Sequence, residues 1–264
     1  MTNDVASSPM VGSLSMSWNR QTRLFAYEAG YEILRTLRTP SFVIPTLAFP
    51  VVFYLLFAVL LPGQWGNLHK ASYLLATYGV FGVIGPALFG FGVGMAIDRE
   101  QGLLELKRVS PMPMLAYFVA RIVMSVVTAF AVVILLSIVA SLFGEVRLSL
   151  QQWLGLMAAL LLGTLPFCAM GLWIGSLVKG QAAVGIVNLI YLPMSVLSGL
   201  WMPLFVFPTL LQKLAMLWPA WHLAQLALGI TGQIHQVNAL LHVAMLVGYT
   251  LLFLSLALWR MRGR

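Results

Sequence analysis

Long apolar runs, separated by short polar loops, dominate this sequence. Six of them approach or exceed the roughly 20 residues that an α-helix needs to cross a bilayer. Of the 264 residues, 61% are hydrophobic and 8% are charged, which is more apolar surface than one globular core of this length can bury. We therefore expect an all-α integral membrane protein with six transmembrane helices, at about residues 41–61, 73–97, 114–143, 153–178, 182–203 and 239–259.

The segment before the first span has two parts. Residues 1–16 are polar and lack the basic start and apolar core of a cleaved signal peptide, so we expect a disordered tail. Residues 17–40 place Leu24, Tyr27 and Leu34 at helical spacing, with charged residues on the other faces. This pattern is typical of an amphipathic helix in the membrane interface. Its polar face either serves as an anchor only or also touches a soluble partner.

Between the fifth and sixth spans, residues 201–235 are apolar but interrupted by Pro203, Pro208 and Pro219. Proline and glycine break helices, and tryptophans such as Trp201 and Trp218 favour the membrane interface. We expect broken, non-spanning helices at the outer leaflet. Residues 17–264 would then form one transmembrane domain.

Lysine and arginine are distributed unevenly between the two sides of this topology. Twelve of the 15 lie in the N-terminal segment, the second and fourth loops and the C-terminal tail, and three lie in the other loops. Cytoplasmic loops carry such an excess, so both termini and the second loop are predicted to be cytoplasmic. The net charge of +8 then reflects topology and not nucleic-acid binding. Within the third span, Arg121 is expected to snorkel to the nearby interface.

The loop after the second span is unusually rich in charge. Asp98–Pro113 reads DREQGLLELKRVSPMP, with three acidic and three basic residues between two long apolar runs. Charged side chains are costly in hydrocarbon, so this segment must lie in water beside the membrane. It is either a solvated loop that sets topology or a docking element for a soluble partner.

Several kinds of chemistry have no candidate residues in the sequence. There is no G-x-x-x-x-G-K-[ST] loop for a nucleoside triphosphate, no pair of His or Cys residues at metal-ligand spacing, and no catalytic set. No carboxylate lies in the middle of a predicted span, and His242, near the outer end of the last span, is the one candidate proton carrier. Cys168 lies in an apolar run and is interpreted as inert packing. We expect no enzyme activity and no cofactor in this chain.

The motifs around the charged segment resemble those of the type-2 ABC exporter permeases, the membrane subunits that export drugs, lipo-oligosaccharides and polysaccharides. Residues Asp98–Arg108 with Ser110-Pro111 are similar to the family's E-x-x-x-G-x-x-E-x-L-x-x-x-P element. Residues Ser198–Pro203, with the later Pro219, resemble its S-G-x-x-x-P element. The resemblance covers nearly the whole chain, including the N-terminal amphipathic helix and the six spans.

The resemblance implies a half-transporter in the bacterial plasma (inner) membrane, with both termini in the cytoplasm. Two permease chains, expected to form a homodimer, would surround a path, and two copies of a cytoplasmic ATPase would bind ATP and magnesium below them. The charged segment would act as the coupling helix that docks on the ATPase. Its contact residues would come from Asp98, Arg99, Glu100, Gly102, Leu103, Leu104, Glu105, Leu106, Lys107, Arg108 and Pro111.

The cargo is less constrained than the partners. The apolar spans favour an amphiphilic or hydrophobic substrate, such as a drug, a lipid-linked glycan or a peptide, consistent with multidrug efflux. Tyr54, Tyr78, Asn188 and Tyr191 are the polar groups expected in a path lining. Six glycines in the second span serve close packing or make it mobile. A secondary, ion-coupled carrier stays open as the alternative, and a non-transporting scaffold is a third possibility.

Overall fold

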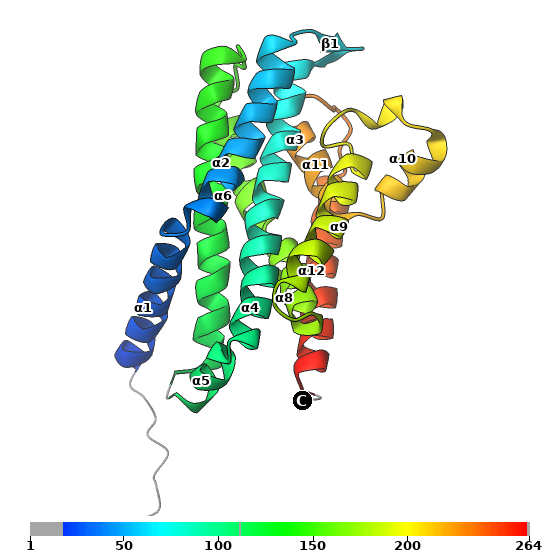
Figure 1. Ribbon diagram of the computed structural model, residues 1–264. Coiled ribbons are helices and arrows are strands. Elements are labelled where there is room, and N and C mark those ends of the chain that lie inside the picture. The colour runs from blue at the N-terminus through cyan, green and yellow to red at the C-terminus, as the bar shows by residue number, and fades with distance from the viewer. Residues whose placement is uncertain (1–17, 111, 263–264) are drawn as a thin grey trace, which may run out of the picture.

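The computed structural model describes residues 18–110 and 112–262, except for the side chains of residues 18–20 and of Arg108. The predicted tail at residues 1–16 and the predicted contact residue Pro111 therefore lie outside the described residues. Nearly all of the described chain is helical, and the long helices run side by side as a bundle (Figure 1). The predicted all-α class is confirmed.

Within the described residues, five helices are long and apolar enough to cross a membrane. They coincide with the first, second, third, fourth and sixth predicted spans to within three residues at each end. They are α2 (Pro40–Tyr54) with its π-helical end η1 (Leu55–Leu60), α3 (Lys70–Gly85) continued by η2 (Pro86–Val93) and α4 (Gly94–Glu100), α6 (Met114–Phe143), α7 (Leu150–Leu162) continued by α8 (Leu165–Leu177), and α12 (Ala239–Arg262).

The fifth predicted span is shorter than expected. Its helix α9 (Ala182–Leu197) has 16 residues, or about 24 Å at 1.5 Å per residue. The prediction that this helix continues to residue 203 is wrong. The backbone leaves the helix because Gly199 takes a φ of +76°, a left-handed conformation that glycine adopts without steric cost.

The chain between α9 and α12 breaks into short elements, in agreement with the predicted broken helices (Figure 1). α10 projects to one side of the bundle, whereas α11 packs against α3 and α12. Prolines begin or directly precede these elements, where the missing backbone N–H costs little. They are η3 (Leu204–Val206), α10 (Thr209–Ala215) and α11 (Pro219–Ile230). Elsewhere in the chain, two short antiparallel strands, β1 (Gln64–Trp65) and β2 (Leu68–His69), connect the first span to α3.

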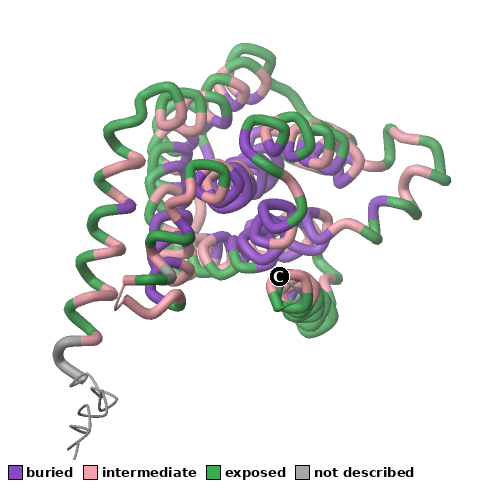
Figure 2. Tube along the Cα trace, turned by 60° about the horizontal axis from the view of Figure 1, so that its bottom comes forward, coloured by how far each residue is buried: buried purple, intermediate pink, exposed green. Residues whose placement is uncertain are grey.

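The second span is the most buried of the five long helices in the described residues, and Figure 2 shows that the buried residues gather at the centre of the bundle. Its most apolar window is 78% buried, compared with 17% for the first span and 11% for the last. Against it, α8 approaches η2 through glycines. A Cβ atom built at Gly175 would lie 2.6 Å from the carbonyl oxygen of Gly92, closer than real Cβ atoms come. At this crossing the glycines therefore serve close helix packing.

The N-terminal helix α1 (Trp18–Leu37) runs along α6. Tyr27 and Tyr31 on its apolar face are 75% and 60% exposed, while Glu32 on its polar face is buried. The polar face is therefore turned toward this same chain. Glu32 is covered by neighbouring helices and Glu28 and Arg35 are partly covered, which the sequence pattern did not predict, whereas Arg23 stays exposed.

Candidate functional site

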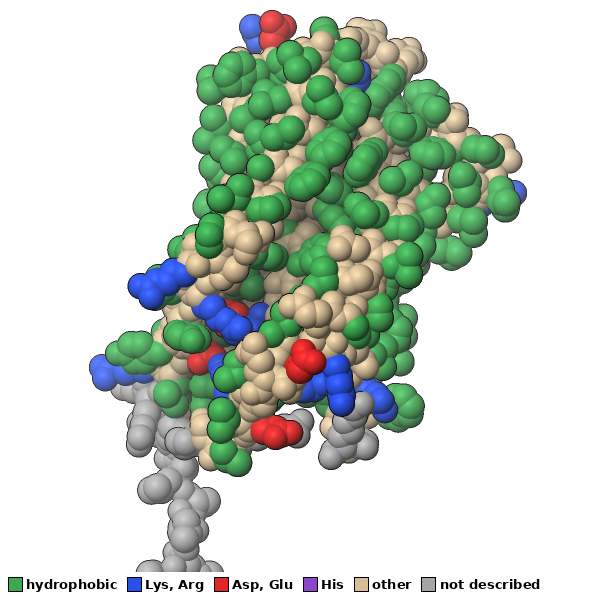
Figure 3. Space-filling model, viewed as in Figure 1, with side chains coloured by type: hydrophobic (Ala, Val, Ile, Leu, Met, Phe, Trp, Pro, Cys, Tyr) green, Lys and Arg blue, Asp and Glu red, His purple; other side chains and the backbone are tan. Residues whose placement is uncertain are grey.

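The charged segment forms a sharp corner at one end of the bundle (Figure 1). α4 ends at Glu100, and α5 (Leu103–Val109) starts after a turn in which Gly102 takes a φ of +72°. Glycine suits this turn because an L side chain disfavours that conformation. We call the two helices and their turn, residues 94–109, the α4–α5 corner. Figure 3 shows charged side chains gathered around this end, below a largely hydrophobic surface.

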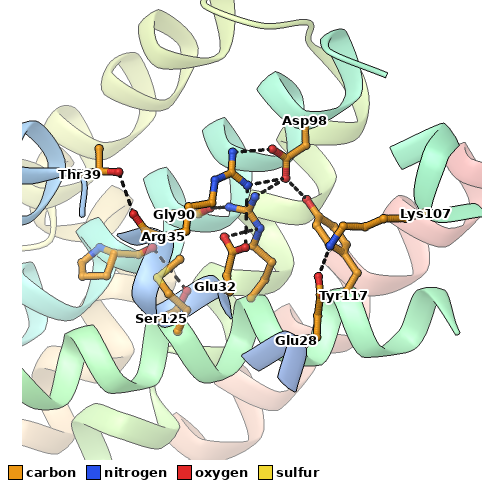
Figure 4. A network of polar contacts seen from close by, with 12 residues as sticks. Glu28, Glu32, Arg35, Thr39, Gly90, Asp98, Lys107, Tyr117 and Ser125 are labelled. Carbon is orange, nitrogen blue, oxygen red and sulfur yellow. Dashed lines mark hydrogen bonds and ion pairs between the residues drawn. The ribbon is translucent and has the colours of Figure 1, made fainter. Parts of the chain in front are cut away.

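Asp98, at the end of the second span, is at the centre of a buried polar network (Figure 4). It is 1% exposed. Arg35 of α1 donates to both of its carboxylate oxygens, at 2.8 and 3.3 Å, and the Tyr117 hydroxyl donates to Oδ2 at 2.9 Å. The hydrogen bond from Arg35 to Asp98 raises the pKa of Arg35 above its usual value. Asp98 is therefore not at the surface, and the prediction that it contacts an ATPase is wrong.

Arg121 of α6 completes the network from the opposite side. It forms an ion pair and hydrogen bond with Asp98, its Nε lies 3.1 Å from Glu32 Oε1, and it donates to the Gly90 carbonyl at 2.6 Å. Its exposed fraction is 3%. The prediction that Arg121 snorkels is wrong, because two carboxylates and a carbonyl surround the guanidinium inside the protein and offset its charge.

A second ion pair connects α1 to the corner itself. Lys107 of α5 bonds to Glu28 of α1, and its ammonium group lies 4.9 Å from the centre of the Tyr117 ring. Arg121 lies over the same ring at 5.3 Å. Together with Asp98, Glu32 and Arg35, these side chains balance three positive charges with three negative ones. We call this set the charge network; it connects α1, α4, α5 and α6.

On its other side the corner contacts the turn between α8 and α9. Arg99 donates to the carbonyl oxygens of Ser176 at 2.5 Å and Val178 at 2.9 Å. The backbone N–H of Gly180 donates to the Ala96 carbonyl at 3.3 Å, and the Glu100 carboxylate lies directly over Gly180. Arg99, predicted to contact an ATPase, is thus committed to bonds within the chain.

The remaining predicted contact residues are divided between surface and interior. Glu100, Glu105 and Leu106 are exposed, whereas Leu104 is 6% exposed and packs in the core. The prediction that Leu104 faces a partner is therefore wrong. Val109, which the sequence analysis missed, is 84% exposed one turn after Leu106. The i, i+3 spacing of these two apolar residues in a polar segment was the available signal. Gly102 and Leu103 are partly buried, and the Arg108 side chain is outside the described residues.

Higher in the bundle, a groove of about 480 Å³ lies between the first, second and fifth apolar runs. Of the four residues predicted to line a path, Asn188 and Tyr191 lie in this groove. Tyr54 and Tyr78 do not, because they are 0% and 1% exposed and packed in the core. Most of the lining is aromatic or aliphatic, including Phe42, Phe49, Phe81, Phe89, Leu192 and Trp201.

Ring contacts hold the groove wall together. Tyr191 stacks on Phe81 at a centroid distance of 4.9 Å and meets Phe89 edge-on at 5.8 Å. Its hydroxyl donates to the Phe81 carbonyl at 3.1 Å. Trp201 meets Phe81 edge-on at 6.0 Å. The groove therefore presents an aromatic surface with few polar groups, which suits an apolar or amphiphilic molecule.

Far from the charged end, His242 is not isolated as the sequence suggested. Its Nδ1 lies 3.0 Å from Nδ1 of His222 in α11, and His222 Nε2 lies 3.1 Å from the Met216 carbonyl. Both rings are buried, and neither lines the groove. Among the described residues, no group of three or more His, Cys, Asp or Glu side chains could hold a metal ion.

Comparison with known proteins places this arrangement among transporters. Residues 24–231 match the family model described as ABC-2 type transporter. The chain is 30% identical over 195 residues to "Putative transport permease YvfS" of Bacillus subtilis (strain 168), covering 72% of this chain and 78% of that protein. The matched region begins in α1 and ends just after α11, so it contains the charge network, the corner and the groove.

Proposed function

Because the chain belongs to the ABC-2 type transporter family, and is thus a multi-pass membrane subunit of an ABC transporter, we propose that it is an exporter permease. Two copies of the chain form a homodimer around the path. Two copies of a separate cytoplasmic ATPase, which bind ATP and magnesium, drive transport. This chain supplies the membrane path and the surface on which the ATPase acts.

The observation that carries this proposal is the α4–α5 corner. Glu105, Leu106 and Val109 are exposed on it, the last two at 63% and 84%. The same short element is tied by Lys107 and Arg99 to helices on both sides. An exposed element anchored in this way transmits a force applied by a partner, whereas a solvated loop would absorb it.

In this proposal the corner and both termini are cytoplasmic, in the bacterial plasma (inner) membrane. Supporting this, the lysines and arginines of the charged end belong to the twelve-residue majority counted along the chain. The short helix α9 serves as the fifth of six spans, with the bilayer or the neighbouring short helices accommodating its length.

The groove is the proposed substrate wall. Its aromatic lining favours a drug, a lipid-linked glycan or a peptide with an apolar part. Asn188 and the edge of Tyr191 supply polar contacts. Two such grooves in a homodimer would give a path with apolar walls and few charges.

The experiment uses the permease co-expressed with a candidate ABC ATPase subunit from the same bacterium. In the variant Glu105→Lys with Leu106→Glu, we expect normal membrane insertion but loss of the ATPase during purification and at least a tenfold fall in permease-stimulated hydrolysis. Lys213→Glu, an exposed charge reversal on α10, is the control and should behave as the unmodified protein does.

Normal assembly and hydrolysis in the corner variant would refute the docking assignment. Transport that continues without any ATPase but collapses with the proton gradient would favour the secondary carrier instead.

A further inference from the structure

The turn between α8 and α9 is held by the corner in addition to its own backbone bonds, such as that from the Val178 N–H to the Ile174 carbonyl. The last carbonyl groups of any helix lack intrahelical partners, and at the end of α8 those of Ser176 and Val178 accept hydrogen bonds from Arg99 of α4. The planar guanidinium can serve two such acceptors at once. A helix end capped from another helix moves with that helix, or else it loses both bonds.

Gly180 makes the close approach of this turn possible. It takes a φ of +49°, a conformation that L side chains rarely adopt. Its N–H reaches the Ala96 carbonyl at 3.3 Å, and a Cβ atom there would overlap the Glu100 carboxylate. The positive φ therefore disfavours a side chain at this position, and an added Cβ would also displace the exposed Glu100 carboxylate from its place against the turn.

The other end of this connection is the groove. α9 starts at Ala182, two residues after Gly180, and carries Asn188 and Tyr191 into the groove wall. From residue 180 to residue 188 the chain rises only about 12 Å if helical. Only about two helical turns of α9 therefore separate the α8–α9 turn from the groove, so a displacement of that turn also moves the groove wall.

We propose that Arg99 and Gly180 are positioning residues that make α9 follow the α4–α5 corner, so that movement of the corner reshapes the groove. This inference rests on the proposed function, because it assumes an ATPase that moves the corner. It adds a route within the chain: corner, α8–α9 turn, α9 and groove wall.

The test reports on the groove without knowledge of the cargo. Asn188→Cys, in a Cys168→Ser background, is alkylated with N-ethylmaleimide in the purified permease–ATPase complex, with and without ATP. Gln101→Cys, at an exposed site in the turn of the corner and outside the proposed contact residues, reports on the corner in the same background. We expect ATP to change both alkylation rates at least threefold.

Arg99→Met and Gly180→Ala are then introduced separately. In each variant, ATP should still change the alkylation rate at position 101, whereas the response to ATP at position 188 should fall to half or less. Gly66→Ala is the matched control, since Gly66 also has a positive φ, +61°, but nothing lies within 4 Å of its added Cβ. It should leave both responses intact.

If position 188 responds to ATP equally with and without the Arg99 and Gly180 substitutions, the inference is refuted. The inference is also refuted if, without the Arg99 and Gly180 substitutions, position 101 responds to ATP and position 188 does not. A complex that fails to assemble, or a corner that shows no response to ATP, counts against the proposed function itself. Arg99→Met removes a side-chain donor and Gly180→Ala changes the backbone of the turn. If one of these variants misfolds, the other still tests the inference.

Discussion

At the charged end of the bundle, buried Arg121 pairs with both Asp98 and Glu32, whereas the groove wall is held by stacked rings such as those of Phe81 and Tyr191. Charged hydrogen bonds require short distances and fixed directions. Aromatic pairs tolerate centroid separations from about 4.5 to 7 Å. The charged end therefore favours one arrangement of α1, α4, α5 and α6, while the groove wall can rearrange at lower cost. Under the proposed function, the stiff part would lie where the ATPase acts and the adjustable part where the substrate passes.

Removal of Arg121 should have the largest effect and would break this comparison most directly. Arg121→Met leaves Glu32 and Asp98 buried without their shared guanidinium, which should destabilise the protein by about 3–5 kcal/mol. Thermal unfolding of the detergent-purified protein measures this as a lower Tm. Arg147→Met, at an exposed site near the opposite end, should change stability by no more than about 0.5 kcal/mol. Equal melting of both variants would mean that the charged end is not locked by the network.

The groove wall should respond less to loss of a single polar contact. Tyr191→Phe removes the hydrogen bond to the Phe81 carbonyl but keeps the stacked ring, so we expect a loss of about 0.5–1.5 kcal/mol. Tyr54→Phe is the matched control, because the Tyr54 hydroxyl is buried without a hydrogen-bond partner among the described residues. Its removal should be neutral or slightly stabilising. The comparison would fail if the Tyr191 change proved as damaging as that of Arg121.

Exchanging the charges of Glu28 and Lys107 tests how much this partly exposed ion pair contributes to stability at the charged end. Glu28→Lys or Lys107→Glu creates a like-charge contact between α1 and α5, and each should cost no more than about 1 kcal/mol because the pair is partly exposed. The double exchange restores an opposite pair and should recover most of the loss. Tm values for the four proteins form a double-mutant cycle. Purely additive effects would show that the two side chains do not interact.

The histidine pair gives the smallest expected effect, since only a single proton is gained or lost. Burial, followed by the nearby His242, lowers the pKa of His222 below its usual 6.5. The unfolded chain therefore binds more protons, so this contribution to stability is complete above pH 6.5 and is lost as the pH falls below it. Melting curves at several pH values measure the loss, with His222→Phe as the reference that should reduce it; His242 is also buried, so part of the dependence should remain. An unchanged pH dependence in that variant would contradict the assignment.

The spans were predictable because long apolar runs leave a chain few alternatives to membrane helices. Met114–Phe143 was predicted to the residue, and the other long helices were close. The end of α9 was missed, since Gly199 leaves the helix inside an apolar stretch where hydropathy carries no boundary signal. The face of each helix that lines the groove could not be predicted either. Tyr54 and Tyr78 lie on almost uniformly apolar helices, and only helix packing determines that they are buried and do not line the groove.

The charged segment was recognisable as a distinct element, but its division into anchors and surface was not. Asp98 and Arg99 point into the chain, while Glu105 and Leu106 point out. Six charges can be paired in many ways, and helical spacing does not connect Glu32 to Arg121 or Asp98 to Arg35. Those partners lie 89 and 63 residues apart in the sequence, which local patterns do not relate.

By itself, the sequence determined the lipid environment, the helical class and the position of a charged element between two spans, because these follow from the cost of placing charge and bare backbone in hydrocarbon. The tertiary structure decided which of those charges became a buried network, which face of α1 turned inward and which aromatic rings lined the groove. These depend on contacts between residues far apart in the chain, where close packing and paired charges select one arrangement of the helices from many of equal hydropathy.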